Sequence, residues 1–239
     1  MEHISAKPPL LFLCHRIPFP PNKGDKIRSF NILKKLSEHY EVHLGCFIDD
    51  PFDRQYVDGL KTYCRSIFYL NQNKVLSKIK GLQAFFTHQA ITLPYYYDKR
   101  MKQWVERTVL KYRIDKIFIY SSSMAQYCQK DAEWLTGTER VIDFVDVDSD
   151  KWRQYAEKKQ GIARWVFQRE YRLLAQYEDT ICSEFDHSLF VSPDEAQLFN
   201  QRQPNENKHK VHGMLNGVDI DFFNPQANFS TESLVPSSP

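Results

Sequence analysis

The segment DFVDVDSDKW, residues 143 to 152, holds a dense group of side chains that could do chemistry. Its four aspartates are Asp143, Asp146, Asp148 and Asp150. Carboxylates so closely spaced could bind a metal ion, accept a phosphoryl group or start a helix. Side chains alternate between the two faces of a strand, so Asp143 and Asp146 should diverge. A metal site needs oxygen ligands that converge on one point, and we therefore predict no metal here.

Two other interpretations of this segment stay open. Paired aspartates after an apolar strand are similar to the motif of haloacid-dehalogenase-type phosphatases, in which the first aspartate, here Asp146, is the nucleophile. That motif follows the first strand of those proteins, whereas four expected strands precede it here, and such motifs depend on their context. The other interpretation is helix capping, with Asp148 or Ser149 as N-cap and Asp150 favoured by the helix dipole.

The loop PPNKGDKIRSF, residues 20 to 30, is a second candidate site. Gly24 precedes a predicted helix, where a residue without a side chain lets backbone approach a ligand and free N–H groups favour phosphate. Lys23, Lys26 and Arg28 add positive charge. The spacing matches neither the GxGxxG fingerprint nor a P-loop, so the sequence predicts neither kind of nucleotide site. The alternative is an ordinary loop before a helix that starts with an aspartate.

The elements around these residues must position them. Short apolar runs alternate with helical periodicity, the pattern of an α/β fold with a doubly wound, mainly parallel Rossmann-like sheet. The expected strands cover residues 10–14, 42–48, 66–70, 116–120, 140–146, 188–191 and 210–214. The expected helices cover residues 25–40, 52–64, 74–113 and 149–184, with breaks near 92–94 and at Gly161. Two shorter helices are expected, one from about residue 122 and one opened by Pro193. Ligands of such sheets bind beside the carboxyl ends of the strands.

The composition indicates a folded protein with reduced cysteines and no membrane-spanning segment. The 239 residues are 42% hydrophobic, which is enough for a folded core. Five scattered cysteines without a CxxC pair indicate reduced thiols in a cytoplasmic protein. The sequence shows no convincing signal peptide, and no apolar run approaches the roughly 20 residues of a membrane span.

Two segments are basic and rich in aromatic residues. Residues 74–113 hold nine Lys or Arg against two acidic residues, and residues 151–172 hold seven against two. Such helices suit an anionic membrane surface or nucleic acid, and the alternative is a solvated helix face over a core-facing aromatic stripe. Because nothing resembles a nucleic-acid-binding module, we expect no nucleic-acid partner and favour a peripheral position on the inner membrane.

Several segments, taken in order, carry a family resemblance. They are PFPPNKGDKIRSFNILKKLSEHYEVHL, SSSMAQY, DFVDVDSDKW, REYRLLAQYE, SLFVSPDEAQLF and NGVDIDFFNP. From about residue 9 to residue 225, the chain resembles the N-terminal half of family 4 glycosyltransferases of GT-B fold. Within that family it looks most like the sugar transferases associated with bacterial exosortase (PEP-CTERM) exopolysaccharide loci.

The resemblance implies a retaining, metal-independent transferase without a cofactor. Such an enzyme moves a sugar from a nucleotide-sugar donor to a saccharide or lipid-linked acceptor. By position, Gly24 and Arg28 would approach the donor diphosphate. The implied substrate-binding residues are Asp146, Asp148, Ser149, Ser192 and Glu195, and the implied interdomain hinge is Asn216 and Gly217.

The same resemblance divides the chain. Residues 9–224 would form the acceptor-side domain, and residues 225–239, rich in Ser and Pro, a linker or disordered tail. The donor-binding domain is expected to be absent, so Lys23, Lys26 and Arg28 would supply only part of the positive charge for the leaving diphosphate. The chain would then be a fragment, a truncated gene product or one half of a split enzyme with a separate donor-domain chain. We therefore expect poor turnover from this chain alone. The alternatives are a non-catalytic Rossmann-like partner subunit of a split transferase and an aspartate-dependent phosphatase.

Overall fold

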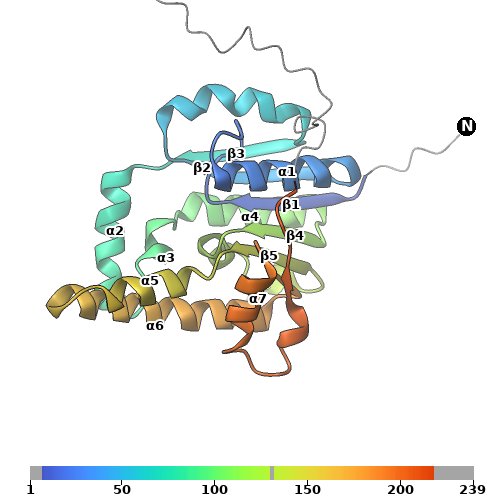
Figure 1. The fold of residues 1–239 in the computed structure, drawn as a ribbon. Helices are drawn as coiled ribbons and strands as arrows, with labels where there is room; N and C mark the ends of the chain where they lie inside the picture. The colour runs from blue at the N-terminus through green and yellow to red at the C-terminus, as the bar shows by residue number, and fades with distance from the viewer. Residues whose placement is uncertain (1–6, 130–131, 218–239) are drawn as a thin grey trace, which may run out of the picture.

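A parallel sheet of seven strands forms the centre of the protein (Figure 1). The computed structural model describes residues 7–129 and 132–217. The strands are β1 Pro9–Cys14, β2 Glu41–Ile48, β3 Ser66–Asn71, β4 Lys116–Tyr120, β5 Glu139–Val145, β6 His187–Phe190 and β7 Val211–Gly213. Their order across the sheet is β3-β2-β1-β4-β5-β6-β7. The order reverses between β1 and β4, and such a switch point is where doubly wound sheets bind ligands.

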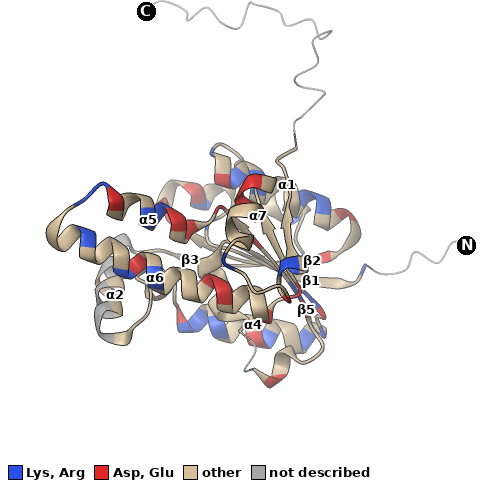
Figure 2. Cartoon of the chain, turned by 60° about the horizontal axis from the view of Figure 1, so that its bottom comes forward, with Lys and Arg blue, Asp and Glu red and all other residues tan. Residues whose placement is uncertain are grey.

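Helices connect the strands and cover both faces of the sheet. The α-helices are α1 Gly24–His39, α2 Lys74–Thr87, α3 Thr92–Tyr95, α4 Lys99–Tyr112, α5 Asp148–Glu157, α6 Gly161–Glu184 and α7 Pro193–Asn200. The 3₁₀ helices are η1 Pro51–Thr62, η2 Ser122–Tyr127, η3 Glu133–Leu135 and η4 Lys208–Lys210. α5 and α6 lie side by side as a hairpin that extends away from the sheet (Figures 1 and 2).

Two apolar cores, one on each face of the sheet, hold these layers together. In β1, Leu11 and Leu13 belong to the core shared with α4, α6 and α7. Leu10 and Phe12 belong to the opposite core, shared with α1 and η1. A strand with helices on both faces needs apolar residues at every position. This need explains why the sequence of β1 is one continuous apolar run.

The expected α/β class, the parallel sheet and the succession of strands along the chain are confirmed. The expected helix over residues 52–64 is a 3₁₀ helix, η1. The helical stretch is broken near residues 92–94 as expected, but at two places, residues 88–91 and 96–98, with the short helix α3 between them. The break at Gly161 is confirmed, since this residue opens α6 with a φ of +60°, which glycine adopts without strain. The expected tail, residues 225–239, lies outside the described residues.

Gly213 of β7 packs directly against the start of α7. A Cβ at this position would lie 2.6 Å from the Pro193 nitrogen and 2.8 Å from the Ser192 carbonyl carbon. We expect Gly213→Ala to lower the free energy of unfolding by about 1–3 kcal/mol, the range for overpacked sites, as measured by urea unfolding. Gly24→Ala is the matched control, because nothing lies within 4 Å of a Cβ there. Equal stability of the two variants would contradict this account.

Candidate functional site

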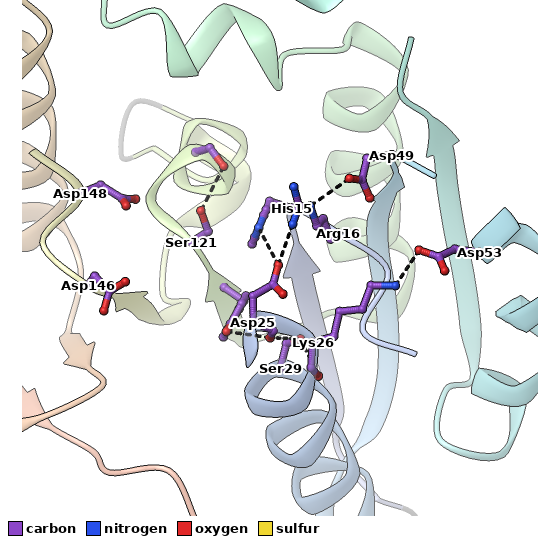
Figure 3. A network of polar contacts seen from close by, with 12 residues as sticks. His15, Arg16, Asp25, Lys26, Ser29, Asp49, Asp53, Ser121, Asp146 and Asp148 are labelled. Atoms are coloured by element: carbon purple, nitrogen blue, oxygen red, sulfur yellow. Dashed lines mark hydrogen bonds and ion pairs between the residues drawn. The ribbon is translucent and has the colours of Figure 1, made fainter. Parts of the chain in front are cut away.

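The loops that follow β1, β4 and β5 meet at the switch point of the sheet (Figure 3). His15 and Arg16 follow β1, Ser121 follows β4, and Asp146 follows β5. The carboxyl ends of parallel strands share one edge of the sheet, so residues far apart in sequence come together there. The first turn of α1, with Gly24, reaches the same edge (Figure 3). This edge is the candidate site.

His15 lies within a small charge network. Arg16 forms ion pairs with Asp25, Nη1 to Oδ2 at 3.0 Å, and with Asp49, Nε to Oδ2 at 3.2 Å. The His15 Nε2 atom lies 3.8 Å from the same Asp25 oxygen. The imidazole also stacks on the ring of Tyr120, with centroids 5.9 Å apart. Two carboxylates thus face one guanidinium, so the network has no surplus of positive charge.

Burial keeps the His15 imidazole neutral. Its side chain is 15% exposed. Burial and then the charge of Arg16 lower its pKa to about 4, against the opposing effects of Asp25 and Asp49. The buried Nδ1 atom has no hydrogen-bond partner of good geometry among the described residues, although the backbone of Tyr120 faces the ring. A neutral imidazole can accept a hydrogen bond from a hydroxyl beside it or take its proton.

The first turn of α1 presents open backbone at this edge. Its N-cap residue, Lys23, makes no side-chain cap hydrogen bond within the described part of the chain. A Cβ at Gly24 would meet no described atom within 4 Å. Free N–H groups at a helix start attract anions. Lys26, by contrast, is 1% exposed, and its Nζ donates to Asp53 Oδ2 at 2.6 Å, so its charge is used inside the fold.

Arg28 is also buried, and its Nε and Nη1 atoms bond inside the fold, whereas its buried Nη2 atom has no hydrogen-bond partner among the described residues. Its Nε donates to Asp143 Oδ2 at 2.8 Å, and its Nη1 donates to the Met214 carbonyl and to Asn216 Oδ1, each at 2.8 Å. Burial raises the pKa of Asp143, and the bonded guanidinium acts against that shift. These bonds tie α1 to β5 and to the segment that holds the expected hinge residues, Asn216 and the exposed Gly217.

Asp146 and Asp148 share one cation. The Lys151 Nζ atom lies 2.7 Å from Asp146 Oδ2 and 3.2 Å from Asp148 Oδ1. The Ser122 hydroxyl donates to Asp148 Oδ2 at 3.4 Å. Burial raises the pKa of Asp148, and Lys151 opposes this shift. Asp143 is 0% exposed and bonds elsewhere, so Asp143 and Asp146 diverge as the alternation of side chains along a strand predicts.

Ser149 faces the core instead of the open edge. It is 0% exposed, and its hydroxyl donates to Glu178 Oε2 at 2.6 Å. The Ser149 backbone N–H donates to Glu178 Oε1 at 3.0 Å. Arg202 donates to both the Ser149 hydroxyl and the Glu178 carboxylate. Burial raises the pKa of Glu178 to about 7, although Arg202 opposes the shift.

The start of α5 is therefore held from outside the helix. Its N-cap is Val147, without a side-chain cap bond, so the expected N-cap at Asp148 or Ser149 is wrong. The Val147 N–H donates to Glu195 Oε2 at 2.8 Å. Ser192 in turn caps α7, because its Oγ accepts from the Glu195 N–H at 3.2 Å. Ser192 and Glu195 thus fix the loop that carries Asp146 and Asp148.

Two strand ends carry strained backbone. Ser121 has a φ of +80° and Val145 a φ of +72°. Positive φ is costly for residues other than glycine, about 1–3 kcal/mol each, and such residues cluster at functional sites. Both positions end strands that border the candidate site. Within the described ranges, no group of three His, Cys, Asp or Glu residues gathers as metal ligands would.

Sequence reasoning did not single out Glu178, Arg202 or Lys151. A signal for Glu178 was present, because this charged residue lies between Leu174 and Ile181 on the apolar face of α6. A charge on such a face needs a buried partner. No local pattern identified that partner as Arg202, which lies in the loop after α7.

Two solved structures share the fold of this chain. The chain is similar to sucrose-phosphate synthase from Thermosynechococcus elongatus, with a TM-score of 0.55 and 14% identity over 90% of this chain and 49% of that one. It is also similar to the N-terminal domain of trehalose-6-phosphate phosphatase from Candida albicans, with a TM-score of 0.51 and 12% identity over 93% of this chain and 51% of that one. A structure of TcCGT1 in complex with UDP gives a TM-score of 0.49 and 9% identity over 89% of this chain and 51% of that one.

These likenesses concern the Rossmann-like fold alone, because all three identities are low. The chain spans about half the length of each of these proteins, and its fold corresponds to one half of a GT-B chain. No protein-family model matches the chain, and no curated protein matches it.

The buried, neutral His15 should make the fold sensitive to acid. Its pKa of about 4 lies below its ordinary value of 6.5, so the unfolded chain takes up the proton first. The contribution of His15 to stability is complete above pH 6.5 and is lost as the pH falls toward 4. Between pH 7 and pH 5 we expect His15 to lower the free energy of unfolding by about 2 kcal/mol. This loss is measured as the difference between the urea unfolding curves at the two pH values.

The substitution His15→Gln should reduce that difference by about 2 kcal/mol, whatever it does to stability at pH 7. His39→Gln is the matched control, since this histidine is 64% exposed and should leave the difference unchanged. An unaltered pH difference in His15→Gln would show that His15 is protonated at pH 5 in the folded protein.

Proposed function

We propose that this chain forms the acceptor-side half of a glycosyltransferase, which moves a sugar from a nucleotide-sugar to a saccharide or lipid-linked acceptor. The observation that carries the proposal is the uncapped start of α1, open at Gly24, beside the switch point of the sheet. The GT-B-type fold and the sequence resemblance to family 4 glycosyltransferases support it. A second Rossmann-like domain, on the same polypeptide or on another, would bind most of the donor.

In this proposal the donor diphosphate meets the backbone at Gly24 and the exposed side chain of Lys23. Arg28 takes a positioning role, because its bonds to Asp143 hold α1 in place. Arg16 is paired with carboxylates, so little positive charge is left to stabilise a leaving diphosphate. The remainder would come from the donor half, since developing negative charge needs positioned cations. Turnover by this half alone is therefore expected to be poor.

The acceptor would lie on the other side of the edge, against Asp146, Asp148 and His15. Carboxylates and a neutral imidazole accept hydrogen bonds from sugar hydroxyls. The shared ion pairs with Lys151 hold the two carboxylates side by side. Ser149, Ser192 and Glu195 would act indirectly, through the loop that they fix.

We also propose that the tip of the α5–α6 hairpin binds an anionic membrane surface. Tyr155, Ile162 and Trp165 are 52%, 82% and 59% exposed, and the exposed Lys158 and Lys159 lie between them in sequence. Figure 2 shows Lys and Arg residues along both helices of the hairpin. Apolar side chains among basic ones suit insertion between anionic headgroups. No helix in the described ranges is long and apolar enough to span a bilayer.

In residues 74–113, most apolar side chains of α4 face the core, including Met101, Val105 and Val109. Val75 and Ile79 of α2 and Leu110 of α4 are exposed, at 67%, 52% and 58%. We assign the membrane contact to residues 151–172, because two exposed lysines lie directly between exposed apolar side chains there.

The donor side is tested by titrating the protein with UDP and GDP and following backbone amide shifts by NMR. We expect weak binding that shifts the Gly24 and Asp25 amides, because this half supplies few contacts. Gly24→Val should weaken this binding roughly tenfold, since a branched side chain blocks close approach of phosphate to backbone. Gly24→Ala should have a smaller effect, and neither variant should unfold earlier in urea. The absence of any shift at Gly24 would reject the donor contact and favour a non-catalytic partner subunit.

The membrane contact is tested by sedimentation with vesicles of three parts phosphatidylcholine to one part phosphatidylglycerol. Lys158→Glu combined with Lys159→Glu should weaken binding at least about tenfold, at about 1 kcal/mol for each basic residue lost. Ile162→Ser should weaken it further. Leu110→Ser, which removes an exposed apolar side chain from the other basic segment, should bind like the unchanged protein. Binding that depends on Leu110 and not on the hairpin would reject this assignment.

A further inference from the structure

A cavity of about 600 Å³ lies beside the candidate site, where the segment around α3, the helix η2 and the middle of α6 meet. This volume falls within the range of small-molecule sites, roughly 300–1,000 Å³. Gln126 of η2 lines the cavity, and η2 begins directly after Ser121 of the candidate site. The proposed contacts to donor and acceptor leave this cavity unused.

Amide side chains provide much of the polar lining. They are Gln89, Gln126, Gln129 and Gln176. Each amide offers both donors and an acceptor. A ring of hydroxyl groups needs this combination, because every hydroxyl both donates and accepts. No Asp or Glu is among the described lining residues, and Lys80 is the one Lys or Arg among them. The cavity therefore suits a neutral, hydroxyl-rich ligand better than a cation or a polyphosphate.

Two tyrosines complete the lining with apolar ring surface and a buried hydroxyl. Tyr97 and Tyr177 both line the cavity, and the C–H faces of a sugar ring can pack on such rings. The Tyr177 hydroxyl oxygen is buried and has no hydrogen-bond partner of good geometry in the described ranges, although the backbone N–H of Gln126 faces it. A buried hydroxyl without a good partner favours a ligand that supplies one.

The walls of the cavity are held in place by buried contacts. The Gln126 Nε2 atom donates to the Leu93 carbonyl at 3.1 Å and to the Ser123 carbonyl at 2.6 Å. Glu170 of α6 is 0% exposed, and its Oε2 accepts from the Ile91 N–H at 2.7 Å. Arg169 donates to the Gln89 carbonyl at 3.3 Å. Residues 89–91 are thereby fixed to α6, so the cavity is preformed.

We propose that this cavity binds a neutral saccharide unit. The inference deepens the proposed function and rests on it for its biological use, because a second sugar site beside the first would let the domain hold an acceptor of more than one unit. The binding itself needs no donor and no second domain. It can therefore be measured separately from transfer.

The experiment measures saccharide binding to the chain without any nucleotide. The probes are glucose, galactose, mannose, N-acetylglucosamine, maltose and cellobiose, each followed by saturation-transfer NMR and by the side-chain amide signals of the protein. We expect at least one of them to bind and to shift the amide signals of Gln126 and Gln176. Gln89→Ala combined with Gln176→Ala should weaken that binding about tenfold, as expected for the loss of two hydrogen bonds.

Gln168→Ala is the matched control, because Gln168 is an exposed glutamine of the same helix, α6, and does not line the cavity. Gln89 and Gln176 are also exposed, so none of these variants should change the urea midpoint. No binding of any probe, or binding that the double variant leaves unchanged, would overturn the proposal. If the unchanged protein binds UDP at Gly24 but no saccharide, the cavity proposal alone is rejected. If it binds a saccharide but shows no UDP shift at Gly24, the donor contact alone is rejected.

Discussion

The buried ion pair between Arg28 and Asp143 is the contact on which the arrangement of the site depends. Their side chains are 3% and 0% exposed. Removing two charges from water costs several kcal/mol for each ion, and only good geometry with further hydrogen bonds offsets that cost. Here the further bonds go to Met214 and Asn216. One guanidinium thus fixes the start of the domain to its centre and to the segment after its last strand.

The same principle places the loop that carries Asp146 and Asp148. Glu178 and Glu195 come from two different helices, and both accept hydrogen bonds from backbone N–H groups at the start of α5. A buried carboxylate without such donors would be costly, so the position of this loop and the ionisation of Glu178 depend on each other. Asp146 and Asp148 therefore lie on a loop that is held in place from two sides. Residues that recognise the hydroxyl groups of a ligand need such fixed positions.

Charge is distributed unevenly between the core and the open edge. Lys26 and Arg28 turn inward to partners in η1 and β5, and the edge keeps the carboxylates, a neutral imidazole and open backbone. Such an edge suits hydroxyl groups, and it offers a phosphate only the open backbone at the start of α1. This distribution fits an acceptor-side half whose partner domain carries the cations for the leaving group. The amide-lined cavity beyond η2 extends the same preference for neutral, hydroxyl-rich ligands.

The sequence by itself determined the fold class, the succession of strands and helices along the chain and the break at Gly161, because these depend on local patterns. A strand buried on both faces must be apolar throughout, and a helix start at positive φ favours glycine. It also located the loops that form the site, since loops after parallel strands share one edge. The tertiary structure alone decided which polar side chains face that edge. Arg28 and Asp143 are 115 residues apart, and local periodicity cannot tell whether a cation near a helix start meets solvent or a carboxylate on a distant strand. That choice depends on the order of strands in the sheet, which brings the partner to within bonding distance.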